Sequence, residues 1–175
     1  MSNLLKIPSS DNGGCFNVVV ETPRGSAAKL KFDGKLKCFT LSKSLLLGLT
    51  YPYDWGFIPS TRGPDGDPLD AMVIHDVATY PGLVLRCTII GVLEAMQKEK
   101  GGKKTRNDRF IAVPVESHRD KETDNVDQLP SEVKNELQKF FKATDELERK
   151  TIEFLGWKGP RKAASLIEKF IRPAK

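Results

Sequence analysis

The sequence predicts a mainly β protein of the α+β class, in which a closed or nearly closed antiparallel barrel carries helices on its outside. Short β-rich segments separated by turn residues fill the first two thirds of the chain, and two amphipathic helical segments follow. The 175 residues suffice for one hydrophobic core, and no repeat or low-complexity segment marks a boundary. We therefore expect a single domain spanning residues 1–175.

Composition and charge are those of an ordinary globular protein. Apolar residues make up 39% and charged residues 29% of the chain, and the net charge of +5 favours acidic partners without requiring nucleic acid. Cys15, Cys38 and Cys87 are odd in number and form no C-x-x-C pair, which indicates reduced thiols in the cytoplasm. Residues 1–12 contain no apolar core of a secretory signal, and the most apolar run, residues 45–49, is too short to span a bilayer.

The first third of the chain predicts a strand and a hairpin. Residues 16–21 are rich in β-branched side chains and lie between Gly14 and Pro23, a pattern typical of a strand. Residues 29–41 alternate polar and apolar side chains on both sides of Gly34. This alternation predicts a hairpin with one buried face and one exposed, lysine-rich face.

Three further β-rich segments continue the barrel: residues 71–77, 84–93 and 110–115. A Tyr-Pro-Gly turn at residues 80–82 separates the first two. Residues 51–57 hold four aromatic side chains in seven positions, which a buried corner of the core would explain.

Residues 94–109 are polar and contain glycine, and two interpretations stay open for them. A solvated loop would explain the concentration of charge. An anion-facing loop, held firmly where it joins the next strand, is the alternative. The basic residues of this segment are Lys98, Lys100, Lys103, Lys104, Arg106 and Arg109.

The last third predicts two helices and one strand. A polar linker covers residues 120–127, and Pro130 suits the first turn of a helix whose apolar residues recur at i, i+4, i+7 and i+8. Residues 151–157 indicate a short strand and turn. Pro160 then begins a final helix with one apolar face.

The chemistry of the chain is expected in the turn that contains Asp65, Asp67 and Asp70. Three carboxylates within six residues repel one another unless a cation lies among their oxygens, and Mg²⁺ and Ca²⁺ are the ions that such clusters bind best. Gly66 permits a tight turn, and Pro68 restricts φ and removes a donor. The apolar run that follows predicts a buried strand, so the turn would be anchored to a rigid element.

Other interpretations of this turn fit less well. A surface Asp/Gly/Pro turn needs no ligand and stays open on spacing alone. A calcium EF-hand loop requires glycine at its sixth position, where Asp70 lies. Aspartyl-phosphate chemistry places its carboxylate near a strand, but residues 61–64 do not have the pattern of one.

With these residues considered together, the chain resembles the soluble family I inorganic pyrophosphatases. Residues 65–70, Asp-Gly-Asp-Pro-Leu-Asp, match the family signature, and residues 51–57 resemble its Tyr-Pro-x-Asn-Tyr-Gly-Phe segment. The other segments that match are residues 18–23, 82–92, 111–114, 140–141 and 156–157. The resemblance implies a closed five-stranded antiparallel OB-like barrel, Mg²⁺ dependence, a cytoplasmic location and a homo-oligomer, commonly a hexamer.

The resemblance also implies roles for acidic residues. Asp65 and Asp70 would bind the activating metal, and Glu21 would bind a metal through water. Asn107 stands near the position of a further metal ligand. Asp67 would lie beside the water that attacks phosphorus, which makes it a catalytic residue.

The remaining roles concern the substrate. Tyr51 would be the second catalytic residue, and Lys29, Lys43 and Arg109 would bind phosphate oxygens. Lysine and arginine side chains stabilise the charge of a leaving phosphate, which suits the hydrolysis of a phosphoanhydride.

Several positions in the site depart from the family pattern. Lys31 stands where the family has a second carboxylate, and Trp55 retains a ring but lacks the phenol of a tyrosine. Gln97 and Asn107 stand near the places of two metal-binding aspartates, and residues 144–145 replace a Tyr-Lys pair. Two further changes keep the charge: Lys43 stands where the family has arginine, and Arg109 stands where it has lysine. The first metal site is therefore complete, whereas the outer metal and phosphate subsites are altered.

The expected function is Mg²⁺-dependent hydrolysis of pyrophosphate to two phosphates. Two alternatives stay open: a family member acting on another phosphoanhydride or phosphoester, and a catalytically inactive oligomer that binds anions or nucleic acid. Asp108 or Glu99 is a candidate replacement for a lost ligand. Neither a membrane nor nucleic acid is an expected partner of the enzyme. Because one turn carries Asp67 and Asp70, their asparagine variants are expected to fold alike.

Overall fold

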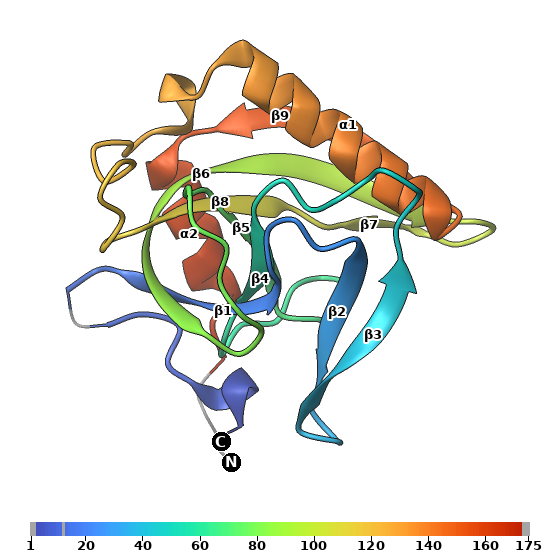
Figure 1. Cartoon of the computed structure of the whole chain (residues 1–175), viewed down its shortest axis with the longest axis horizontal. Coiled ribbons are helices and arrows are strands. Elements are labelled where there is room, and N and C mark those ends of the chain that lie inside the picture. The colour runs from blue at the N-terminus through green and yellow to red at the C-terminus, as the bar shows by residue number, and fades with distance from the viewer. Residues whose placement is uncertain (1–2, 12, 173–175) are drawn as a thin grey trace.

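The protein, described by a computed structural model over residues 3–11 and 13–172, is built on a closed ring of five strands (Figure 1). The described residues leave out residues 1, 2, 12 and 173–175. These positions belong to the predicted single domain, and three of them belong to the segment 1–12 in which no secretory signal was expected. The strands of the ring, in spatial order, are β1 (Phe16–Thr22), β4 (Asp54–Ile58), β5 (Leu69–Val73), β8 (Arg109–Pro114) and β6 (Val84–Glu99). β6 pairs with β1 and closes the ring.

The predicted mainly β class is confirmed, and one strand pairing differs from the prediction. The β1–β4, β4–β5, β6–β8 and β1–β6 pairs are antiparallel, but β5 and β8 run parallel. Parallel neighbouring strands need a long connection, and here residues 74–108, which include β6, connect β5 to β8. The prediction of an entirely antiparallel ring was therefore wrong at this one pair.

β6 is longer than predicted and reaches beyond the ring. Its second half pairs with β9 (Lys150–Lys158) and, at its end, with β7 (Lys104–Arg106). The interpretation of residues 94–109 as a solvated loop was wrong for most of the segment, because backbone pairing on both edges makes it a sheet. β9 confirms the strand predicted over residues 151–157.

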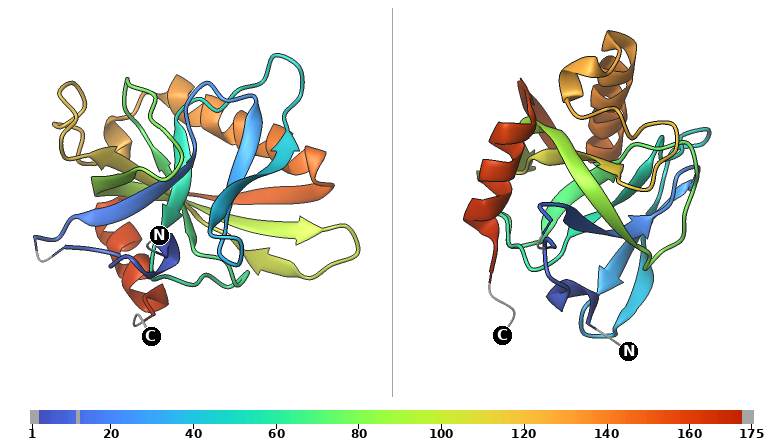
Figure 2. Two further views of the ribbon diagram at one scale, coloured as in Figure 1. Left: turned by 60° about the horizontal axis from the view of Figure 1, so that its bottom comes forward. Right: turned by 90° about the vertical axis from the view of Figure 1, so that its left-hand side faces the viewer.

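The predicted hairpin is confirmed as β2 (Ala28–Asp33) and β3 (Cys38–Ser44), a separate two-stranded sheet. The predicted division into a buried apolar face and an exposed lysine face was wrong, because Leu41 is 64% exposed whereas the Lys29 side chain is 26% exposed. Figure 2 shows this hairpin standing beside the ring. Phe32 is the one buried side chain in the two strands, so the hairpin rests on the ring through few contacts. Its inner side is left to form the wall of a cavity.

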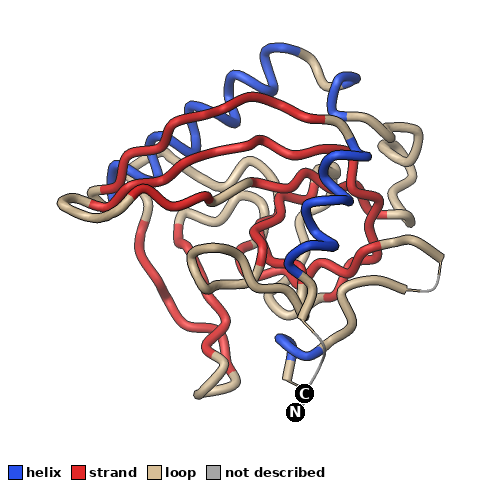
Figure 3. Tube along the Cα trace, turned by 180° about the vertical axis from the view of Figure 1, so that it is seen from behind, coloured by secondary structure: helices blue, strands red, loops and turns tan. Residues whose placement is uncertain are grey.

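Two helices cover the outside of the strands, as Figure 3 shows from behind. α1 (Ser131–Leu147) packs on β9, and α2 (Pro160–Phe170) packs on β6. Both confirm the predicted helices. Short 3-10 turns, η1 (Leu4–Lys6) and η2 (Val126–Gln128), complete the described elements. None of the helices in residues 3–11 and 13–172 combines the length and apolar character that crossing a membrane requires.

Both faces of the central strands are buried. On β5, Ala71 and Val73 face one cluster with α2, whereas Met72 joins a second cluster with α1. This explains why the sequence here is apolar without alternation. Closure also needs a glycine: a Cβ on Gly56 would lie 1.9 Å from the carbonyl oxygen of Val19.

Candidate active site

A cavity of about 810 Å³ opens between the β2–β3 hairpin, the ends of β5 and β8, and the C-terminal end of α1. Eight of the nine predicted site residues line it: Glu21, Lys29, Tyr51, Asp65, Asp67, Asp70, Asn107 and Arg109. The ninth predicted residue, Lys43, does not line the cavity. Its ammonium group lies 2.8 Å from Oε1 of Glu148, which does line it. The fold thus gathers residues that are 88 positions apart in the chain (Glu21 to Arg109).

The backbone of the acidic turn is held by its own hydrogen bonds. Gly66 has φ of 91°, a left-handed conformation that glycine adopts without strain. The Asp67 amide donates to Asp65 Oδ1 at 3.1 Å, and the Gly63 amide donates to the Asp67 carbonyl oxygen at 2.7 Å. The tight turn predicted for this stretch is present, and it presents its carboxylates to the cavity.

The parallel pairing of β5 with β8 places Arg109 directly beside Asp70. Arg109 Nη1 lies 3.0 Å from Asp70 Oδ2, and the guanidinium group also lies over the rings of Trp55 and Phe141 at 5.6 and 5.7 Å. The Arg109 side chain is only 5% exposed, and its buried Nε has no hydrogen-bond partner among the described residues. Arg109 is therefore a fixed positive charge in the cavity wall.

Burial and mutual repulsion favour the neutral form of the carboxylates around Asp70. Glu21 is buried, and its side chain accepts a hydrogen bond from the Phe32 amide at 2.8 Å. Burial, reinforced by the charge of Asp70, raises the pKa of Glu21 to about 7. Burial also raises the pKa of Asp65 and of Asp70. A hard cation between these oxygens would reverse that preference, so the donor set suits Mg²⁺.

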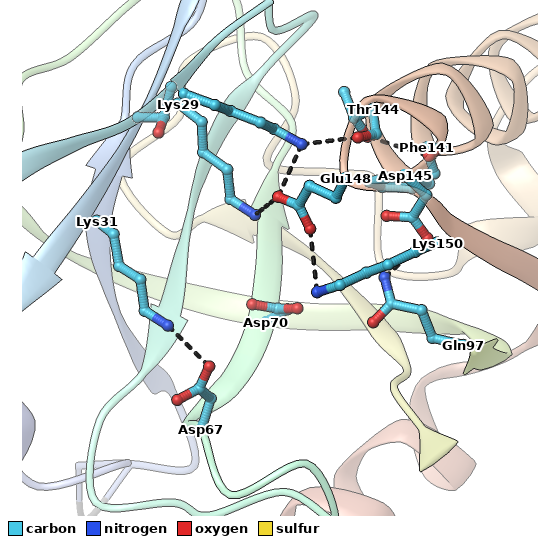
Figure 4. A network of polar contacts seen from close by, with 12 residues as sticks. Lys29, Lys31, Asp67, Asp70, Gln97, Phe141, Thr144, Asp145, Glu148 and Lys150 are labelled. Atoms are coloured by element: carbon cyan, nitrogen blue, oxygen red, sulfur yellow. Dashed lines mark hydrogen bonds and ion pairs between the residues drawn. The ribbon is translucent and has the colours of Figure 1, made fainter. Parts of the chain in front are cut away.

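The acidic side chains do not enclose a metal in this conformation. Over residues 3–11 and 13–172, no three histidine, cysteine, aspartate or glutamate side chains converge closely enough to hold an ion. Asp67 turns to Lys31, whose Nζ lies 2.8 Å from Asp67 Oδ2 (Figure 4). Lys31 therefore supplies a positive charge beside the acidic turn.

A chain of amide hydrogen bonds occupies the region where further metal ligands were expected. Gln97 Nε2 donates to Asp145 Oδ2 at 2.7 Å, and Asn107 Nδ2 donates to Gln97 Oε1 at 3.1 Å. Asn107 Oδ1 accepts from Arg109. The metal role of Asn107 stays a prediction, and it would require Arg109 to release this oxygen.

The two suggested replacement ligands differ in position. Asp108 is buried and accepts from the Ala95 amide at 2.9 Å and from Arg106 at 2.5 Å, and it does not line the main cavity. Glu99 does line the cavity and lies 3.4 Å from Lys150. Of the two, Glu99 is the one whose carboxylate can reach a ligand in the cavity.

Tyr51 is part of both the core and the site. It is buried, and its ring contacts Phe140 edge-on, with centroids 5.0 Å apart. Burial and the surrounding carboxylates, Asp70 first among them, raise the pKa of its phenol well above the ordinary value. The phenol therefore stays protonated at neutral pH and can only donate or accept a hydrogen bond.

The sequence did not reveal a group of charged residues at the end of α1. Glu148, the C-cap residue of α1, bonds to Lys43 and Lys150 and lies near Lys29. Burial opposes ionisation, but the three lysines outweigh it and lower the pKa of Glu148 to about 2. No local pattern identifies such a group, because its members come from separate elements.

Comparison with known proteins agrees with this geometry. The model of the family described as inorganic pyrophosphatase matches residues 18–175. An inorganic pyrophosphatase from Synechocystis sp. is 38% identical over 97% of this chain and 98% of its own, and one from Thermus thermophilus is 37% identical over 94% and 93%. The crystal structure of inorganic pyrophosphatase from Thermus thermophilus superposes with a TM-score of 0.87 at 31% identity, covering 97% of each chain. An inorganic pyrophosphatase from Neisseria gonorrhoeae superposes with a TM-score of 0.84 at 26% identity over 94% of each chain. The chain belongs to the inorganic pyrophosphatase family.

Proposed function

We propose that this protein is an inorganic diphosphatase that hydrolyses pyrophosphate to two phosphates and depends on Mg²⁺. The observation that carries the proposal is that four carboxylates and two cationic side chains line the same cavity. These residues are Glu21, Asp65, Asp67, Asp70, Lys29 and Arg109. Carboxylates bind a divalent cation, and the cationic groups bind phosphate oxygens.

The residues divide the chemistry between them. Asp65 and Asp70 would hold Mg²⁺, with Glu21 binding through water, and the bound cation would lower the pKa of a water and neutralise phosphate charge. Asp67 accepts a proton from the attacking water while the oxygen of that water forms a bond to phosphorus. The bridging P–O bond breaks, and the leaving phosphate keeps the electron pair.

Fixed cations stabilise the charge that this step moves to the leaving phosphate. Arg109 is held by Asp70 and by the two aromatic rings, so it is oriented before the substrate arrives. Lys29 is half-buried at the edge of the hairpin and points into the same cavity. Charges that need no reorientation are the most effective in stabilising a transition state.

Release of phosphate from pyrophosphate, measured with Mg²⁺ and with EDTA, tests the proposal. Asp67→Asn should lower turnover by about 10²–10⁴-fold, which is typical for the loss of a general base. Asp127→Asn is the matched control, because Asp127 is 77% exposed and outside the cavity. Absence of phosphate release above the EDTA blank, from about pH 6 to 9, would refute the proposal.

Calorimetric titration separates the two aspartates. Asp70→Asn should weaken Mg²⁺ binding, because a neutral amide replaces a charge opposite the cation. Asp67→Asn should leave that affinity largely unchanged. Equal loss of Mg²⁺ affinity in both variants would contradict the division of roles.

We also propose a cytoplasmic homo-hexamer made of one domain per chain. Free cysteines at positions 15, 38 and 87 support a reducing compartment, and the hexamer rests on the family resemblance. Sedimentation at micromolar concentration tests the assembly, and a strict monomer would contradict it.

A further inference from the structure

Three lysines surround one carboxylate at the rim of the cavity, as Figure 4 shows in part. Glu148 Oε1 lies 2.8 Å from Lys43 Nζ and 3.5 Å from Lys29 Nζ, and Glu148 Oε2 lies 3.1 Å from Lys150 Nζ. All four side chains are between 16% and 26% exposed. Partial burial weakens screening, so these charges act on one another and on any ligand beside them.

The lysines are presented by three different strands. Lys29 on β2 pairs with Lys43 on β3 in the hairpin register, and Lys150 begins β9, where it pairs with Glu99 of β6. Backbone pairing fixes all three positions, and Glu148 connects them across the rim. The Lys43 ammonium group also donates to the Thr144 carbonyl oxygen at 2.7 Å, in the last turn of α1.

The charges of this group do not balance. Three ammonium groups face one carboxylate, which leaves two positive charges uncompensated within the group. The second partner of Lys150, Glu99, is 73% exposed, so water screens that pair and it is easily exchanged. Lys29, Lys150 and Glu148 line the cavity, so the surplus charge faces the space where the substrate would bind.

The α1 residues beside the group add no positive charge. Thr144 and Asp145 face the cavity at the end of the helix, and Asp145 is bonded to Gln97. A second phosphate on this side of the cavity therefore has no cation from α1. Lys150, at the start of β9, places an ammonium group beside this end of the helix.

We propose that Lys150 is a substrate-binding residue, which binds the outer phosphate of pyrophosphate together with Lys29 and Lys43, and that Glu148 is the positioning residue for the three. The proposal rests on the proposed function and adds to it a cation on β9 beside the end of α1. Phosphate oxygens take the place of the exposed Glu99 opposite Lys150. Glu148 stays bonded and holds the ammonium groups toward the ligand.

Binding of methylenediphosphonate, a pyrophosphate analogue with a carbon bridge, tests the proposal by calorimetry in the presence of Mg²⁺. Lys150→Gln should bind it about tenfold or more weakly, as expected for the loss of one charged hydrogen bond. Lys150→Arg should recover most of the affinity, because it restores the charge. Lys142→Gln is the matched control: Lys142 is exposed on α1, with its ammonium group 5.8 Å from the Phe154 ring, and its affinity should stay within about twofold.

A chemical measurement on the unmodified protein makes the test independent of variant folding. Acetylation of lysines by acetic anhydride, followed by peptide mass analysis, should slow at Lys150 when methylenediphosphonate and Mg²⁺ are present. Lys142 should react at the same rate with and without the analogue. Unchanged affinity of Lys150→Gln, or no protection of Lys150, would overturn the proposal.

The positioning role of Glu148 has its own readout. Glu148→Gln should raise KM for pyrophosphate while kcat changes less than twofold, since the ammonium groups remain but lose their common anchor. A fall in kcat at constant KM would contradict positioning. If the wild type binds the analogue but does not hydrolyse pyrophosphate, the proposed function is refuted and the assignment of Lys150 stands. If the wild type does not bind the analogue, the assignment of Lys150 is refuted.

Discussion

Asp70→Asn should destabilise the protein more than Asp67→Asn does. The structure replaces the expectation, drawn from their shared turn, that the two variants fold alike. Asp70 is bonded to Arg109, whose side chain is 5% exposed, and Asp67 is bonded to Lys31 in a pair whose side chains are 50% and 59% exposed. One substitution therefore leaves a buried charge without its partner, and the other breaks a surface ion pair.

The magnitudes follow from these environments. Breaking a fully buried ion pair costs about 3–5 kcal/mol, but Asp70 is 25% exposed and the asparagine oxygen can still accept from Arg109. We expect a loss of about 2 kcal/mol, which lowers Tm by about 4–8 °C in a chain of this length. For Asp67→Asn the expected loss is about 0–1 kcal/mol, the usual value of an exposed pair.

Thermal melting in EDTA at about pH 8 measures the difference, because a high pH counteracts the burial that raises the pKa of Asp70. EDTA removes any contribution of bound metal. Equal Tm values for the two variants would refute the argument that Arg109 depends on Asp70 for its compensation. A larger loss for Asp67→Asn would refute it as well.

Three further outcomes are expected. In EDTA the wild type should lose about 3 kcal/mol of unfolding free energy between about pH 4.5 and 7, because burial raises the pKa of Glu21 from 4.5 to about 7 and the fold prefers its neutral form; Glu21→Gln should lose less, and an equal loss would be inconsistent with this cause. Gly56→Ala should yield little soluble protein, since its Cβ would meet the Val19 carbonyl oxygen at 1.9 Å, and a wild-type melting curve would contradict the clash. Trp55→Leu should lower Tm by about 5 °C or more, because it leaves a cavity and removes the ring under Arg109, whereas an unchanged Tm would show that neither contact stabilises the fold.

The sequence by itself determined the features that depend on neighbouring residues. Alternation over residues 29–41 predicted the β2–β3 hairpin, and the apolar period after Pro130 predicted α1. Gly66 and Pro68 predicted the tight acidic turn, whose φ of 91° at Gly66 the structure contains. Backbone preferences and burial of one face act over a few residues, so they leave a readable pattern.

The tertiary structure decided the features that depend on which segments meet. The pairing of Asp70 with Arg109 follows from the parallel β5–β8 register, and nothing in either segment alone specifies that register. The bond between Lys29 and Glu148 joins residues 119 positions apart. Such contacts arise from closure of the ring and from packing of α1 on β9. A one-residue shift in the register of a strand would turn its side chains to the other face of the sheet. The charge distribution of the cavity is therefore a property of the folded chain, because only the fold brings its members within hydrogen-bond distance.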